Sequence, residues 1–188
     1  MGPRWDAMND RQLLLAYVQA RDVQAFGAFV VRHEGALLAF ATAFLRDETT
    51  AQDVVQEAFL RAARHPHRLL ALPAQHAGER NWLLKVVRDL SVDWLRKRAS
   101  ERRAVEGLAA VAPKAVPAPL TAAEGREELG RMRAAIGQLR PRYRELLLLK
   151  VQERKSYKEI AQITGLSVTN VGFLLHQAVK ELAKGLSD

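Results

Sequence analysis

Residues 156–182 read SYKEIAQITGLSVTNVGFLLHQAVKEL, and this stretch decides the fold of the chain. Ser156 stands three positions before Glu159, which predicts a capping box at the start of a helix. Gly165 follows and predicts a left-handed turn, and Ser167 suits the N-cap of a second helix. Two short helices joined by a glycine turn are typical of a helix-turn-helix, whose second helix usually enters the DNA major groove. An ordinary helical hairpin in a protein core is the alternative.

The second helix of this stretch has an apolar face, and residues 167–179 carry no formal charge. Val171, Leu175, Ala178 and Leu182 follow at spacings of four, three and four, which predicts one buried face. Phe173 lies off that face, so we expect it to point outward, where a bulky aromatic side chain usually contacts a partner.

Composition favours a basic, all-helical protein with a polyanionic partner. The 188 residues carry a formal net charge of +8, which suits nucleic acid or an acidic membrane surface. The chain has no cysteine, which excludes disulfides and thiolate metal sites, and the Cys/His ligand pattern is missing, so no metal site is predicted. No signal-type segment and no run near ~18 apolar residues is evident, so we expect no membrane insertion and a cytoplasmic location.

The N-terminal part predicts three helices. Asn9 with Gln12 opens the first, and Asp22 caps a second that ends near Arg46. Thr49 or Thr50 opens the third, which Pro66 ends. Residues 65–79 are expected to form a loop. The polar side of the third helix is either a solvated surface or a docking surface.

Residues 81–98, NWLLKVVRDLSVDWLRKR, predict a helix that is apolar on one side and cationic on the other. Trp82, Val86, Leu90 and Trp94 recur every four residues. A cationic face suits phosphates, and aromatic side chains beside cations suit unpaired bases. The alternative, favoured for the two tryptophans, is that they belong to the core.

Residues 104–120 are rich in proline and alanine and predict an extended tether. It would separate a domain at 1–103 from a smaller one at 121–188. Thr121 with Glu124 predicts another capping box, opening a helix to about Gln138. Pro141 suits the first position of the next helix.

Over nearly its whole length the chain resembles the extracytoplasmic-function group of bacterial sigma-70-type sigma factors. The resemblance rests on three motifs in order: Asp53-Val-Val-Gln-Glu57 with Phe59, Trp82-Leu with the residues after it, and Tyr157-Lys-Glu-Ile-Ala with Gly165. It implies a two-domain helical protein that binds core RNA polymerase, directs it to promoters and helps melt the DNA. No cofactor and no catalytic residue are implied.

The resemblance also assigns residues to partners. It assigns docking on the clamp helices of the largest polymerase subunit to Asp53, Gln56, Glu57, Leu60 and Arg61. Contact with the downstream (−10) promoter element falls to Arg68, Lys85, Arg88, Asp89, Arg96, Lys97 and Arg98. Contact with the upstream (−35) element falls to Arg154, Lys155, Ser167, Thr169, Asn170, Phe173, His176 and Gln177. An anti-sigma factor is a possible further partner.

Two departures from the family pattern bear on DNA binding. Asp89 stands where the family usually has asparagine, and an ionised carboxylate accepts hydrogen bonds only and is repelled by phosphate. The second helix of the helix-turn-helix lacks the usual lysine and arginines, so its upstream contacts are expected to be weak.

Two other function classes are weighed against this interpretation. An operator-binding regulator with a helical sensor or dimerisation domain would need a ligand pocket or dimer interface in residues 1–100. A nucleic-acid enzyme would need a second carboxylate or histidine pair to match Asp53 and Glu57, and the sequence offers none at suitable spacing.

Overall fold

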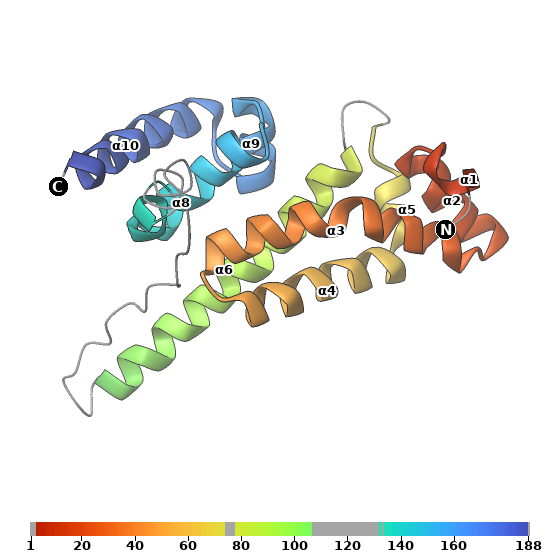
Figure 1. Cartoon of the computed structure of the whole chain (residues 1–188), viewed down its shortest axis with the longest axis horizontal. Helices are drawn as coiled ribbons and strands as arrows, with labels where there is room; N and C mark the ends of the chain where they lie inside the picture. The colour runs from red at the N-terminus through yellow and green to blue at the C-terminus, as the bar shows by residue number, and fades with distance from the viewer. Residues whose placement is uncertain (1–2, 74–77, 107–131, 133, 188) are drawn as a thin grey trace, which may run out of the picture. The chain divides into compact units, whose positions relative to one another are not determined.

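The computed structural model describes residues 3–73, 78–106, 132 and 134–187, and within these ranges the chain forms helices, turns and loops with no strand (Figure 1). The predicted all-helical class is therefore confirmed. Contacts divide the chain into two units, Met1–Ser91 and Val92–Asp188, and the division falls inside one long helix. Most of the predicted tether and the capping box expected at Thr121 and Glu124 lie outside the described residues.

The first unit is a bundle organised around α3. Its helices are α1 (Pro3–Asp6), α2 (Asp10–Ala20), α3 (Val23–Leu45), α4 (Glu48–Arg64), α5 (Pro66–Leu70) and the first part of α6 (Gly78–Glu106). Helix α3 packs against both α2 and α4, and α5 packs against α2 and α4 in turn. The order places α4 and α6 where their outer faces are available for partners.

Polar side chains set the ends of α2 and α3 as predicted. The backbone N–H of Asn9 donates to Gln12 Oε1 at 2.8 Å, and the N–H of Gln12 donates to Asn9 Oδ1 at 2.9 Å. The Asp22 carboxylate accepts from the Ala25 N–H at 3.1 Å, and α3 ends before Arg46. These local bonds satisfy backbone donors that the first helical turn leaves unpaired.

Three boundaries differ from the expectation. Helix α4 begins at Glu48, because Asp47 and not a threonine is its N-cap: its carboxylate accepts from the Thr50 N–H at 2.9 Å. Pro66 opens α5 within the segment expected to be a loop, since proline suits the first helical position. Helix α6 begins at Gly78 rather than at Asn81 and continues through Glu106, so the first residues of the predicted tether are helical.

Helix α3 supplies more buried apolar side chains to the first unit than any other described helix. Its largest fully buried side chains are Phe29, Leu37, Phe40 and Phe44. By length and composition it is the one helix among the described residues that could cross a membrane, contrary to the expectation that no such stretch exists. The core helix of a soluble bundle passes the same test, and α3 packs between two other helices.

The second unit contains the helix-turn-helix. Its described helices are α8 (Pro141–Leu147), a π-helical turn that continues α8 (Leu148–Gln152), α9 (Tyr157–Thr164) and α10 (Val168–Ser187). The predicted capping box is present at Ser156 and Glu159, and Gly165 is left-handed with φ of 73°. Ser167 Oγ accepts from the Asn170 N–H at 3.2 Å, so it caps α10. Val171, Leu175 and Ala178 form the buried face of α10.

Candidate functional site

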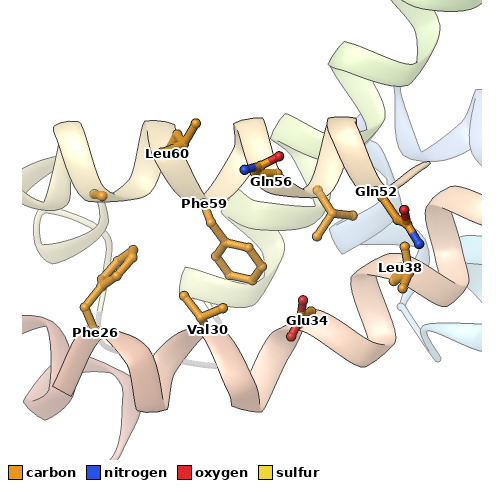
Figure 2. A pocket seen from close by; sticks show the side chains of 10 residues that line it. Phe26, Val30, Glu34, Leu38, Gln52, Gln56, Phe59 and Leu60 are labelled. Carbon is orange, nitrogen blue, oxygen red and sulfur yellow. The ribbon is translucent and has the colours of Figure 1, made fainter. Parts of the chain in front are cut away.

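Two hollows flank α4 in the first unit. The first is a groove of about 490 Å³ between α3 and α4. Figure 2 shows the two helices as its facing walls. Its lining is Phe26, Val30, Glu34 and Leu38 from α3, with Gln52, Val55, Gln56, Phe59, Leu60 and Ala63 from α4. The groove is mainly apolar, so it suits a partner with apolar side chains.

The second hollow, here called the cationic pocket, has a volume of about 450 Å³ and lies among α4, α5 and α6. Its lining is Glu57, Arg61, Arg64, His65, Arg68, Trp82, Lys85, Val86 and Asp89. Four lysine or arginine side chains surround one indole ring and one valine. Cations beside an aromatic ring suit an unstacked base with its flanking phosphates.

The structure divides the residues predicted to bind polymerase between these hollows. Gln56 and Leu60 line the groove, whereas Glu57 and Arg61 line the cationic pocket. Asp53 is exposed and lies between the two sets on the helix surface. At about 100° per residue, Asp53 is some 60° from Gln56 and about 40° from Glu57, which accounts for the division.

Two carboxylates bind the cations of the pocket. Glu57 Oε1 accepts from Arg61 Nε at 2.9 Å and lies 3.9 Å from Arg64 Nη1. The hydrogen bond from Arg61 holds the pKa of the Glu57 carboxyl below its ordinary value. Asp89 has the same role on α6.

Asp89 uses both of its carboxylate oxygens. Oδ2 is 3.0 Å from Lys85 Nζ, and Oδ1 accepts from Arg88 Nη1 at 2.8 Å. The Arg88 side chain is 14% exposed, whereas that of Lys85 is 49% exposed.

Three residues that line the cationic pocket were not among those predicted for DNA contact: Arg64, His65 and Trp82. The sequence signal for Arg64 is its spacing: it follows Arg61 by three residues, so both lie on one face of α4.

The buried face of α6 differs from the predicted stripe. Its fully buried residues are Leu83, Leu84, Val87 and Ser91, whereas Trp82 and Trp94 are half-buried. The tryptophans are therefore not fully enclosed core residues. The guanidinium of Arg98 lies 4.9 Å from the centre of the Trp94 ring. Arg96, Lys97 and Arg98 are all exposed.

The outer surface of α10 is exposed and mostly uncharged. Phe173 is 61% exposed, which confirms that it points outward, and Thr169, Asn170 and His176 are exposed beside it. Gln177 is half-buried. The surface can offer hydrogen bonds and apolar contact to base edges.

Gly172 lies next to the Tyr157 ring, which comes from α9. A Cβ atom at this position would lie 3.4 Å from that ring, an ordinary van der Waals distance, so the packing does not require glycine here. Lys150 Nζ lies 5.2 Å from the centre of the same ring.

The basic residues before α9 differ in accessibility. Arg154 is exposed, whereas Lys155 is 5% exposed and its Nζ lies 3.6 Å from Glu159 Oε1. The ammonium group of Lys155 is therefore taken up by the packing of its own domain. It offers little surface to a phosphate, contrary to the role expected from the sequence.

Comparisons with known proteins agree with this architecture. The family model for sigma-70 region 2 matches residues 29–101, and that for sigma-70 region 4 matches residues 129–182. The chain is 34% identical over 86% of its length to "Probable RNA polymerase sigma factor RfaY" of Xanthomonas campestris pv. campestris, although it spans only 40% of that protein. It is 29% identical to "ECF RNA polymerase sigma factor SigM" of Bacillus subtilis, over 76% of this chain and 83% of SigM.

The fold is also that of a solved sigma factor. The structure of the sigma factor RpoE in complex with the anti-sigma factor NepR from Bartonella quintana matches with a TM-score of 0.66 and 22% identity, over 86% of this chain and 96% of that one. At this identity the match speaks for the fold alone. Two regions of one family occur here in order, in a two-unit helical fold with a helix-turn-helix at its end. The chain therefore belongs to the sigma-70 family, in the extracytoplasmic-function group of factors that bind RNA polymerase and direct the initiation of transcription at promoters.

Proposed function

We propose that the groove between α3 and α4 docks on the clamp helices of the largest subunit of core RNA polymerase. The observation that carries this proposal is an apolar groove with a 42% exposed leucine, Leu60, on the polar side of α4. Gln56 lies beside it, and exposed Asp53 supplies a charge at the rim. A central apolar contact surrounded by polar groups is the usual anatomy of a protein interface.

The cationic pocket and the exposed end of α6 are proposed to bind the −10 element as it opens. Arg68, Lys85 and Trp82 line the same pocket, so one unpaired base can stack while neighbouring phosphates meet cations. Arg96, Lys97 and Arg98, later in α6, are proposed as further phosphate contacts. Binding to the single strand favours the melted promoter over the duplex.

The helix-turn-helix is proposed to read the −35 element. Asn170 and His176 can hydrogen-bond base edges, and Phe173 can meet a thymine methyl group. Arg154 supplies charge for phosphate, while Lys155 is left out because it is buried. Ser167 contributes to this binding surface as the N-cap of α10. Thr169 and Gln177 contribute as neighbouring polar groups.

Some wider properties follow from the same proposal. The chain acts in the cytoplasm, is not itself an enzyme, and works with residues 1–103 and 121–188 as separate domains on a tether at 104–120. An anti-sigma factor is a further proposed partner, in line with the complex of RpoE with the anti-sigma factor NepR.

A binding and transcription experiment tests this function. The full chain is added to sigma-free core polymerase, and the double variant Gln56→Ala, Leu60→Ala is compared with Val31→Ala, which alters an exposed valine on α3 outside the groove. We expect the double variant to lose about tenfold or more in affinity for core, because truncating central interface side chains costs about 1–3 kcal/mol. Val31→Ala should bind as the parent does. Unchanged binding by the double variant contradicts the docking site, and a lack of promoter-dependent transcripts from the parent contradicts the function.

A further inference from the structure

Three of the four lysine and arginine side chains that line the cationic pocket are held in ion pairs, and Arg68 is the fourth. Glu57 contacts Arg61 and Arg64, and Asp89 contacts Lys85 and Arg88, so two carboxylates each bind two cations. All but Arg88 line the same hollow. A pocket built only to attract phosphate has no use for carboxylates on its wall, because they repel the phosphate and occupy its partners.

We propose that Asp89, supported by Glu57, limits how tightly this pocket holds the opened DNA strand. A phosphate that contacts Arg61, Arg64 or Lys85 must take the cation from a carboxylate that already binds it. The inference rests on the proposed binding of single-stranded DNA at this pocket and goes beyond it by assigning opposing roles to residues within it. It also reassigns Glu57, which the resemblance to sigma factors placed among the polymerase-binding residues, to the surface of α4 that is proposed to bind DNA.

The geometry singles out the pair of Asp89 and Lys85. The Lys85 side chain is 49% exposed, and four methylene groups let its ammonium group turn toward a phosphate once the pair is broken. Arg88 is 14% exposed and has less freedom to leave. Removing the Asp89 charge therefore frees mainly one cation and removes one repulsion.

An asparagine at position 89 keeps the shape of the side chain and loses the charge. We expect Asp89→Asn to raise affinity for single-stranded DNA by roughly twofold to fivefold at low salt, as expected from the small energies of exposed ion pairs. The slope of log affinity against log salt should steepen by about 0.7, the amount for one added phosphate contact on a single strand. Glu57→Gln should act in the same direction through Arg61.

The test uses the full chain assembled with core polymerase and a labelled single-stranded oligonucleotide pool of random sequence, with core alone as the background. Asp89→Glu retains the charge, so its slope against salt should stay closer to that of the parent than to that of Asp89→Asn. Glu48→Gln removes the same charge from the first turn of α4, roughly 14 Å along the helix from Glu57, and should change neither affinity nor slope.

Each outcome decides the matter. A steeper slope for Asp89→Asn with near-parental slopes for both controls supports the proposal. Unchanged or weaker binding by Asp89→Asn overturns it, as does an equal gain in Glu48→Gln, which would show an effect of net charge alone. If the assembled parent binds no more strand than core alone, the proposed function of the pocket fails as well, so the two failures are distinguishable.

Discussion

Asp10 shows how one residue fastens the N-terminal end of the bundle. Its two carboxylate oxygens contact Arg32 Nη1 and His33 Nε2, each at 2.8 Å, across the junction between α2 and α3. Arg32 also donates to the Met8 carbonyl at 2.8 Å. Burial raises the pKa of the Asp10 carboxyl, but the bonds from His33 and Arg32 outweigh burial, so the pKa lies below its ordinary value.

A lowered carboxyl pKa links stability to pH with a definite sign. The native state favours ionised Asp10, so its contribution is complete at neutral pH and is lost as pH falls below about 4 through the folded-state pKa. We expect Asp10→Asn to lower the free energy of unfolding by about 1–2 kcal/mol at pH 7, with the gap to the parent shrinking near pH 3. Urea titrations at both pH values measure this gap. Asp6→Asn, an exposed acid on α1, serves as the control, and a gap that does not change with pH contradicts the role of Asp10.

At the scale of the element, two glycines in helical segments have opposite roles. Gly35 is exposed in the middle of α3, and an added Cβ atom meets nothing within 4 Å. Gly165 ends α9 with φ of 73°, a conformation that side-chain-bearing residues resist. The same substitution should therefore have opposite effects at the two positions.

We expect Gly35→Ala to raise the free energy of unfolding of its unit by about 0.5–1 kcal/mol, because alanine has the higher helix propensity. Gly165→Ala should lower that of the second unit by about 1–2 kcal/mol, because a left-handed residue with a Cβ atom is strained. Thermal unfolding followed by circular dichroism measures both changes. A neutral Gly165→Ala would mean that the turn between α9 and α10 rearranges at little cost.

Capping chemistry accounts for what the sequence predicts best. Asn9, Asp22 and Ser156 each sit at a predicted helix start, because the bond from cap to backbone is local and needs no knowledge of the tertiary structure. The start of α4 was misplaced since the run Asp47-Glu-Thr-Thr50 offers several caps, and sequence alone does not choose among them. The π-helical turn at 148–152 had no sequence signal.

The buried face of α6 was misjudged for a geometric reason. Residues spaced by four drift about 40° per step on a helix of 3.6 residues per turn, so Trp82 and Trp94 stand about 120° apart. Trp94 lies about 20° from Val87, whereas Trp82 lies about 140° from it, so the two tryptophans do not share one face. Leu84, Val87 and Ser91 lie within about 60° of one another and make the buried line. Likewise, the division of the α4 surface between two hollows depends on where α3 and α6 pack, which periodicity does not reveal.

At the scale of the whole molecule, the net charge and the covalent link between the two units matter more for DNA binding than any single contact. The net charge of +8 draws the chain to DNA over a Debye length, while residues 168–179 of α10 add no fixed charge. We therefore expect recognition of the upstream element by α10 to be weak by itself. It should gain from attachment to a unit that is proposed to bind polymerase and the opened strand.

We expect a cut between residues 106 and 132 to weaken binding of the upstream element. The sequence predicts a tether here, and a tether would supply an effective concentration of about 1 mM, so at about 1 µM protein the cut fragments should lose roughly a hundredfold or more in occupancy of the upstream element. Binding of the N-terminal fragment to core should be unchanged, because the groove and the cationic pocket lie wholly within it. The measurement is transcription from a promoter with and without the upstream element, before and after cleavage at an inserted protease site, with the uncut insertion variant as control. If transcription with the cut fragments depends on the upstream element as strongly as it does with the intact chain, the second unit binds that element strongly by itself. The tether then contributes nothing to promoter choice.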